Sequence, residues 1–439
     1  VVLVSGTCFA EFGIDVVCVD NDEDKIRRLN NGEIPIYEPG LEDLVARQTR
    51  GGRLSFTTDK SEAVKGADAV FLAVGTPSRR GGEANLEYIY AAVRELAGYI
   101  EDYTVIVTKS TVPVGTAREI EKILSSLVSH DKFDVCSNPE FLREGAAIND
   151  FMRPDRVVIG VDTRKAEEVM HRLYRPLYLN ETPMVVTSPE TAEIIKYASN
   201  AFLATKITFI NEIADLCESA GGNVQDVAKS MGLDGRIGPK FLHAGPGYGG
   251  SCFPKDTKAL VNIGKKFDAP QSIVQSVVNF NEARRYKMAE RITKACGGSV
   301  KDKKIAILGI SFKPNTDDVR EAPSLYIIPA LQDKGARISA FDPAAMDNAA
   351  LELSNIEWAQ GPYEAAKDAD ALVILTEWNE FRALDFLKLG EIMSEKCLID
   401  LRNIYKLPFM QAHGFKYFSI GRPDLIPERY DKLREVSSK

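Results

Sequence analysis

The sequence has no long apolar run, few histidines and no excess of basic residues. No stretch of about 18 apolar residues occurs, so we expect no membrane-spanning helix. The formal net charge is −8, and lysines and arginines are scattered, which argues against a nucleic-acid-binding protein. The length of 439 residues and the ordinary balance of apolar and charged residues instead indicate a globular enzyme of two or three domains.

Cysteines are also few and irregularly placed. The seven cysteines include no Cys-x-x-Cys pair, and only four histidines accompany them. Disulfide frameworks and zinc sites need paired ligands, and an odd count in a long chain does not favour either. We therefore expect reduced thiols, no bound metal and a cytoplasmic location.

Short apolar strands alternate with helical stretches in two similar halves of the chain. Several of these strands end at an acidic residue, as at Asp20 and Asp342. Continuous apolar strands between helices are typical of parallel sheets covered on both faces. The pattern predicts an α/β protein with two doubly wound, Rossmann-like domains. The strand-bearing segments are Asp15–Asp20, Lys65–Pro77 and Tyr103–Thr111, then Lys304–Leu308, Arg337–Asp342, Lys367–Thr376 and Lys396–Arg402.

Between the halves lies a segment of helical periodicity. Ser188 or Thr191 can cap its start, and Gly221 with the following glycine ends it. A helix of about 30 residues spans about 45 Å, long enough to join two domains and to offer a dimer surface. We therefore divide the chain into residues 1–187, 188–298 and 299–439.

Residues 247–256 hold one cysteine, Cys252, in a glycine-rich turn, followed by Lys255 and Asp256. A nucleophilic thiolate needs access, positive potential and donors for a developing oxyanion, and this turn offers all three. A buried structural cysteine is the alternative interpretation. Lys196 and Asn200 lie one turn apart on the central helix, either as site residues or as two solvated polar side chains.

Seven segments together resemble the nucleotide-sugar 6-dehydrogenases, the family of UDP-glucose and GDP-mannose dehydrogenases. They follow one another in the order found in that family, and the resemblance extends from residue 3 to the C-terminus. The segments are Lys109–Gly115, Asn138–Gly145, Lys196–Asn200, Arg236–Gly238, Gly247–Asp256, Phe312-Lys313 and Asp318–Glu321.

The resemblance implies oxidation of UDP-glucose at C6 to UDP-glucuronate, with two hydrides passing to two NAD⁺. Cys252 would hold the intermediate aldehyde as a thiohemiacetal and then as a thioester, which water cleaves. Oxidation of GDP-mannose or UDP-N-acetylmannosamine is an alternative in the same class. Binding of a nucleotide sugar without turnover is an alternative in another class.

Roles for further residues follow from the same resemblance. Lys196 and Asn200 would hold the C6 oxygen and stabilise its negative charge. Asp256 would polarise water or steady Lys196, while Thr111 and Glu140 would orient water or move protons. Arg236 would reach the site of a neighbouring subunit, so a homodimer or higher homo-oligomer is expected. The remaining substrate contacts would be Phe141, Leu142, Arg143, Glu144, Phe241, His243, Tyr248, Gly249, Phe312, Lys313 and Arg402.

On the cofactor side, Asp20 would accept hydrogen bonds from the adenosine ribose and favour NAD over NADP. The glycine fingerprint of dinucleotide sites does not occur near the start, where Val2 stands in place of its last glycine. We therefore expect further residues ahead of Val1. The other contacts implied for NAD are Lys25, Gly75, Thr76, Pro77, Ser110, Thr111, Glu144, Cys252, Lys255 and Arg320.

Overall fold

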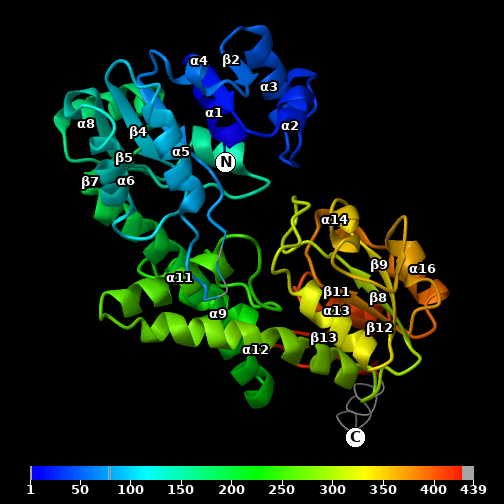
Figure 1. Ribbon diagram of the computed structural model, residues 1–439. Helices are drawn as coiled ribbons and strands as arrows, with labels where there is room; N and C mark the ends of the chain where they lie inside the picture. The colour runs from blue at the N-terminus through cyan, green and yellow to red at the C-terminus, as the bar shows by residue number, and fades with distance from the viewer. Residues whose placement is uncertain (1, 78, 80, 428–439) are drawn as a thin grey trace, which may run out of the picture. The chain divides into compact units, whose positions relative to one another are not determined.

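The computed structural model describes residues 2–77, 79 and 81–427 (Figure 1). The chain forms two compact units. The first comprises Val1–Ser199 and Lys258–Pro270, and the second comprises Asn200–Thr257 and Gln271–Lys439. The division into three domains at 187/188 and 298/299 stays a prediction, because compactness alone does not define the ends of a folding domain.

The strands of the first unit lie in two sheets. Strands β1 and β2 form a parallel pair, and the other five form a sheet of order β3-β4-β5-β6-β7. Only the contact between β5 and β6 is antiparallel, a reversal that the alternation of strands and helices does not predict. The strands are β1 Val16–Val19, β2 Leu54–Thr57, β3 Ala69–Leu72, β4 Thr104–Thr108, β5 Phe133–Ser137, β6 Val157–Gly160 and β7 Met184–Thr187.

Helix α1 (Val2–Glu11) supplies the aromatic centre of the first unit. The Phe9 ring lies 5.0 Å from Phe151, 5.1 Å from Phe71 and 5.3 Å from Tyr174, between ring centroids. The contacts with Phe151 and Tyr174 are edge-to-face, a packing that stabilises a core beyond the area that it buries. The other helices are α2 Glu23–Asn30, α3 Leu41–Arg50, α4 Lys60–Val64, α5 Glu87–Ala97, α6 Thr116–Ser125, α7 Ala147–Met152 and α8 Arg164–Tyr174, with short 3-10 turns at His130–Lys132 and Arg175–Asn180.

The predicted central helix is confirmed as α9, Pro189–Ala220, with 32 residues. The Ser188 hydroxyl accepts a hydrogen bond from the Thr191 backbone N–H at 3.3 Å, so Ser188 is the capping residue of the two candidates. Gly221 follows with φ of 77°, a left-handed conformation that ends the helix.

The second unit contains one parallel sheet of order β10-β9-β8-β11-β12-β13. Counted from β8, this order is 3-2-1-4-5-6, the order of dinucleotide-binding sheets. Strands β11 and β12 are buried along their whole length, as continuous apolar strands require. The strands are β8 Lys304–Leu308, β9 Arg337–Phe341, β10 Ile356–Trp358, β11 Ala371–Ile374, β12 Cys397–Asp400 and β13 Lys416–Ser419.

Helices cover this sheet and continue the central segment. Those next to the sheet are α13 Ser324–Asp333, α14 Met346–Ala350, α15 Pro362–Ala366, α16 Phe386–Ile392 and α17 Leu407–Ala412, with a 3-10 turn at Asn379–Ala383. The central segment adds α10 Val224–Leu233, α11 Phe253–Lys266 and α12 Ser272–Ala295. Among the described residues, no helix is both long and apolar enough to cross a bilayer.

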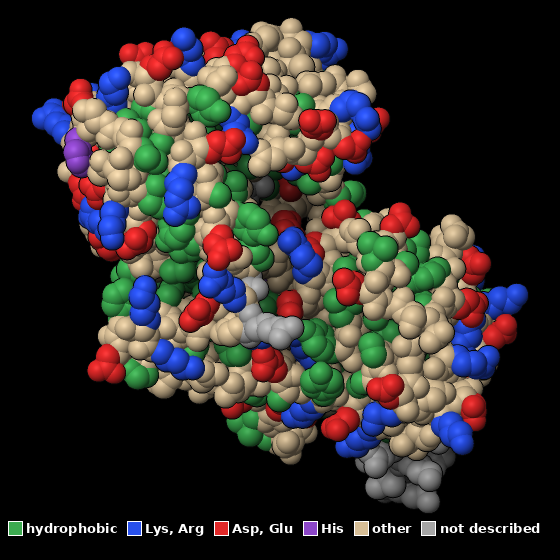
Figure 2. Space-filling model, viewed as in Figure 1, with side chains coloured by type: hydrophobic (Ala, Val, Ile, Leu, Met, Phe, Trp, Pro, Cys, Tyr) green, Lys and Arg blue, Asp and Glu red, His purple; other side chains and the backbone are tan. Residues whose placement is uncertain are grey.

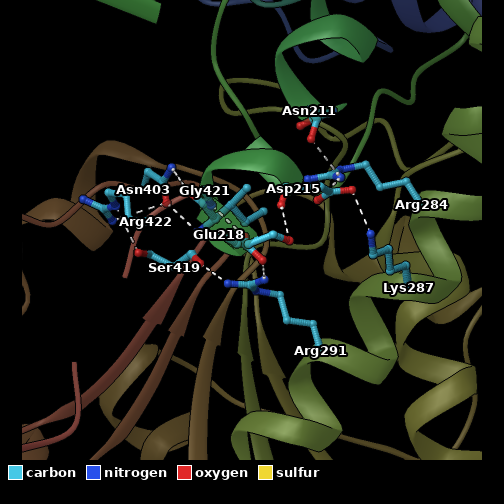
Figure 3. A network of polar contacts seen from close by, with 12 residues as sticks. Asn211, Asp215, Glu218, Arg284, Lys287, Arg291, Asn403, Ser419, Gly421 and Arg422 are labelled. Carbon is cyan, nitrogen blue, oxygen red and sulfur yellow. Dashed lines mark hydrogen bonds and ion pairs between the residues drawn. The ribbon is translucent and has the colours of Figure 1, made fainter. Parts of the chain in front are cut away.

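Ion pairs join the second half of α9 to α12 within the second unit (Figure 3). Asp215 accepts from Arg284 at 3.1 Å and from Lys287 at 2.8 Å, and Glu218 accepts from Arg291 at 2.5 Å. The second oxygen of Glu218 accepts the Gly421 backbone N–H at 2.7 Å. Each carboxylate therefore has two donors, and the network fixes α9 against the segment after β13.

Candidate active site

Cys252 differs from the other six cysteines. Those six are buried, whereas Cys252 is partly exposed. Burial raises the pKa of the Cys18 thiol to about 12, and it does the same for Cys397, so these thiols stay protonated and inert. The Asp256 backbone N–H donates to the Cys252 carbonyl at 2.8 Å, which starts α11 directly after the cysteine. The interpretation as a buried structural cysteine is wrong.

The glycines before Cys252 allow close packing as well as access. A Cβ on Gly249 would lie 2.4 Å from the Glu321 carbonyl oxygen, and a Cβ on Gly250 would lie 2.7 Å from the Phe312 ring. Gly250 also has φ of 82° and donates its N–H to the Arg320 carbonyl at 2.9 Å. Only glycine fits both positions. The loop therefore brings three predicted ligand-binding residues together: Gly249, Phe312 and Arg320.

Asn200 and Asp256 form a buried pair in the second unit. The Asn200 amide donates to Asp256 Oδ2 at 2.6 Å, and Lys255 Nζ lies 3.0 Å from Asp256 Oδ1. Asn200 is 6% exposed and Asp256 is 1% exposed. The carboxylate thus orients the amide, and Lys255 supplies a positive charge beside it.

Lys196 and Glu140 form a second buried pair, in the first unit. Lys196 Nζ donates to the Glu140 carbonyl at 2.5 Å and lies 3.6 Å from Glu140 Oε1. It also lies 5.1 Å from the centre of the Phe141 ring, and Glu140 Oε2 accepts the Leu142 backbone N–H at 2.5 Å. Lys196 is only 4% exposed, so the interpretation of Lys196 and Asn200 as solvated polar residues is wrong.

Thr111, Thr76 and Ser110 meet where β3 and β4 end. The Thr76 hydroxyl donates to the Thr111 carbonyl at 3.1 Å, and the Ser110 hydroxyl donates to the Val74 carbonyl at 2.7 Å. A Cβ on Gly75 would meet nothing within 4 Å, so packing does not explain that glycine. Ligands of parallel sheets bind at this end of the strands, which suits a cofactor site.

Arg402 is the centre of the predicted substrate contacts of the second unit. Its Nε lies 3.0 Å from Glu377 Oε2, and its Nη2 donates to the Phe312 carbonyl at 3.2 Å. Lys313 Nζ lies 5.4 Å from the centre of the Phe312 ring. Lys313 thus lies over the Phe312 ring and Arg402 contacts the Phe312 backbone, so two cations adjoin one residue, an arrangement able to bind a diphosphate.

The other predicted substrate residues occupy varied settings. Tyr248 is buried, and its backbone N–H donates to the Asn281 side chain at 2.9 Å. Phe241 has φ of 66° and lies 6.1 Å from the Phe253 ring. The side chains of His243, Arg143 and Arg236 are exposed, and Glu144 is half-buried. Arg143 pairs with Asp150, and Arg236 pairs with Asp234.

Comparison with known proteins identifies the family. Family models for UDP-glucose/GDP-mannose dehydrogenases match the chain over three consecutive regions: the NAD binding domain at 1–178, the central domain at 190–283 and the UDP binding domain at 306–407. The chain belongs to this family. It is an NAD-dependent dehydrogenase, as the sequence predicts, with an α/β fold of two parallel sheets and a long central helix.

Individual relatives of the family match nearly the whole chain. A UDP-glucose 6-dehydrogenase of Rhizobium meliloti is 59% identical over 425 residues, covering 96% of this chain and 97% of that protein. One of Bacillus subtilis is 48% identical over 423 residues, covering 96% and 91%. A UDP-glucose dehydrogenase structure from Pyrobaculum islandicum superposes with a TM-score of 0.88 at 36% identity, covering 96% and 95%.

The residues at the end of β1 are suited to binding NAD, the cofactor of this family. Asp20 is one-third exposed, and its carboxylate receives Lys25 Nζ at 2.5 Å. Burial alone would raise the pKa of Asp20, but the ammonium and nearby backbone N–H groups outweigh it and keep the pKa below its usual value. An ionised, accessible carboxylate at this position can accept hydrogen bonds from ribose hydroxyls.

Two polar groups near Glu140 received no role from the sequence. Lys109 Nζ donates to the Asn138 side-chain oxygen and to the Tyr174 hydroxyl, both at 3.0 Å. Lys109 and Asn138 occur in segments that resemble the family, but their interaction depends on packing between β4, β5 and α8. A lysine at the end of a fully buried strand was the only available signal.

Proposed function

We propose that the chain oxidises UDP-glucose to UDP-glucuronate in two NAD-dependent steps. The observation that carries the proposal is Cys252, a partly exposed cysteine in a glycine loop directly before α11. It lies four residues before the buried carboxylate of another catalytic candidate, Asp256. An oxidation that stopped at the aldehyde would need no such thiol. The names of the relatives from Rhizobium meliloti and Bacillus subtilis support the same substrate.

The chemistry assigns one covalent step to the protein. The Cys252 thiolate forms a bond to the carbonyl carbon of the aldehyde, which retains the intermediate as a thiohemiacetal. Bound NAD⁺ accepts one hydride in each oxidation. Loss of hydride from the adduct leaves a thioester, and attack by water breaks its C–S bond, releasing the carboxylate and restoring the thiol.

Polar groups of α9 stabilise charge on the C6 oxygen. The Lys196 ammonium and the Asn200 amide donate to that oxygen as it becomes negative, and Asp256 holds the amide in place. Glu140 and Thr111 orient water or move protons. Buried donors of this kind act strongly because they need no reorganisation during the reaction.

We also propose that the chain forms a homodimer or higher homo-oligomer through α9. Phe202, Phe209 and Leu216 recur every seven residues and are 66%, 45% and 60% exposed. Apolar residues at this spacing line one side of a helix and favour pairing with another helix. On the face drawn in Figure 2, basic and acidic side chains are interspersed, unlike a nucleic-acid interface. A cytoplasmic location stays a prediction.

The test is product stoichiometry with three sugar nucleotides. With UDP-glucose and NAD⁺ we expect two NADH for each sugar consumed, and much less turnover of GDP-mannose or UDP-N-acetylmannosamine. The Cys252→Ser variant should stop after the first hydride transfer, or form an ester that water cleaves slowly. A Ser variant giving two NADH at the wild-type rate would remove Cys252 from the mechanism. Absence of turnover with tight binding would favour a binding protein.

Subunit mixing tests whether Arg236 acts across the interface. Arg236→Ala and Cys252→Ser chains, each nearly inactive, are combined and allowed to exchange. If Arg236 serves the neighbouring subunit, a mixed dimer contains one site with both defects and one intact site, so activity returns. With mixed dimers shown to form, a lack of recovery contradicts the shared site.

A further inference from the structure

Lys109 is a buried cation whose direct partners are uncharged. It follows β4, two residues before Thr111, and is 5% exposed. Its ammonium donates to the Asn138 side-chain oxygen and to the Tyr174 hydroxyl, each at 3.0 Å. It also lines a small cavity of about 40 Å³ together with Glu140. Burying an ammonium among neutral groups is unfavourable, so the charge itself needs an explanation.

The partners of Lys109 remain hydrogen-bonded without it. The Tyr174 hydroxyl donates to the Asn138 side-chain oxygen at 2.6 Å, and the Asn138 amide donates to the Val158 carbonyl at 2.7 Å. The Asn138 backbone N–H donates to the Thr108 carbonyl at 2.9 Å. An apolar side chain in place of Lys109 would leave this network closed, so the ammonium is not required for folding.

The charges around Lys109 link it to the Lys196–Glu140 pair. Burial lowers the pKa of Lys109 to about 8, while Glu140 and Cys136 raise that pKa and Lys196 lowers it. Lys196 thus pairs with the Glu140 carboxylate, and Lys109, which lines the same cavity as Glu140, also interacts with its charge. The other titratable groups lining the cavity are Asp150 at α7, Arg156 before β6 and Tyr174 at the end of α8.

We propose that Lys109 is a positioning residue that leaves Lys196 available for the C6 oxygen of the substrate. The Lys109 charge offsets part of the Glu140 charge, which otherwise attracts Lys196. When Lys109 is neutral, Lys196 is held more firmly by Glu140 and stabilises the oxyanion less. The consequence falls on kcat more than on KM, because the interaction matters most as the oxygen becomes negative. The inference rests on the proposed function.

The test is the ratio of wild-type to Lys109→Met kcat as a function of pH. We expect the ratio to exceed about tenfold at pH 7 and to approach one above pH 9, as the wild-type ammonium loses its proton. Groups that do not interact with Lys109 affect both proteins equally, so their effects cancel in the ratio. Lys109→Arg, which stays charged, should retain most activity and lose the alkaline decline. The exposed Lys165→Met is the matched control, with a ratio near one at every pH.

A second measurement separates this role from a structural one. The Tm of Lys109→Met should equal or exceed that of the wild type at pH 7, and any excess should shrink as pH rises toward 10. A ratio independent of pH, or a Lys109→Met protein that melts well below the wild type, overturns the proposal. If the wild type yields no NADH with any of the three sugar nucleotides, the proposed function fails, while the Tm comparison still tests the Lys109 charge.

Discussion

The two compact units differ in how neighbouring groups offset the charges of their lysines and arginines. In the first unit, Lys109 and Lys196 face one carboxylate, Glu140, and their closest partners are neutral groups and a backbone carbonyl. In the second unit, the buried Arg284 and the half-buried Arg291 pair with separate carboxylates, Asp215 and Glu218, that have further donors (Figure 3).

This difference in charge compensation indicates that the first set of cations serves activity and the second serves stability. An ion pair between opposite charges fixes elements against one another, and removing one partner leaves the other in an unfavourable environment. Buried charge with incomplete compensation is retained where chemistry uses it, at the expense of stability. Substitutions of Lys109 or Lys196 should therefore affect activity, and substitutions of Arg284 or Arg291 should affect stability.

The largest expected effect is that of Lys196→Met. Removing a donor to a developing oxyanion lowers kcat by about 10²- to 10³-fold. Stability should not fall, since the variant removes a buried charge while Lys109 still offsets the charge of Glu140. Steady-state kinetics and thermal unfolding check both expectations, with exposed Lys229→Met as the control. A fully folded variant with kcat within threefold of the wild type would contradict the assignment.

Arg291→Met, unlike Lys196→Met, should lower stability and leave activity unchanged. Glu218 would keep only the Gly421 N–H, so we expect the free energy of unfolding to fall by about 2 to 3 kcal/mol. The kcat of the folded protein should stay within twofold. Urea titration measures the first quantity. Lys287→Met removes a half-exposed partner of Asp215 and should change stability by less than about 1 kcal/mol.

Glu193 is a buried carboxylate in the first unit whose charge, and therefore its effect on stability, depends on pH. Its carboxylate accepts the Gly115 and Ala117 N–H groups at 2.7 and 2.9 Å, at the start of α6. Burial raises the pKa of Glu193 to about 7, although the two N–H groups oppose the shift and Glu190 adds to it.

The folded protein therefore binds a proton at Glu193 more tightly than the unfolded chain does. This contribution to stability is present below the unfolded pKa near 4.5 and is lost as pH rises through about 7. We expect a loss of roughly 3 kcal/mol across that window. Glu193→Gln should flatten this part of the stability profile, and an unchanged profile would show that Glu193 titrates normally.

Asp20→Asn concerns an exposed pair and should have the smallest effect. Loss of the pair with Lys25 should change stability by less than about 1 kcal/mol, because solvent screens it. The preference in kcat/KM for NAD⁺ over NADP⁺ should decrease by about tenfold, which is about 1.4 kcal/mol. Equal kcat/KM for the two cofactors in the wild type would argue against a cofactor role for Asp20.

The fold was largely predictable from local patterns. The strand predicted at Lys304–Leu308 has the same bounds as β8, and the predicted helix ends at Gly221, because apolar runs and glycines act within a few residues. The antiparallel contact between β5 and β6 was not predictable, since it depends on how the chain returns after α7.

For the site, the resemblance suggests which residues belong to it but gives none of their contacts. The resemblance supplied Lys196 and Glu140, whereas their hydrogen bond joins positions 56 residues apart and depends on tertiary packing. The packing of Gly250 against Phe312 is similarly nonlocal. Lys109 was missed because a lysine at a strand end is ordinarily a surface residue, and only burial reveals its unusual state. The roles of all these residues stay predictions.

The hydrogen bond between the Gly421 backbone N–H and the Glu218 carboxylate also constrains folding during synthesis. The two residues are 203 positions apart, and Gly421 has φ of 66° with no room for a Cβ beside Val224. The helices α9 and α10 are therefore translated long before the segment that completes their packing. Their apolar surfaces stay uncovered while most of the second unit is still being made, an interval in which chaperone binding would be most useful.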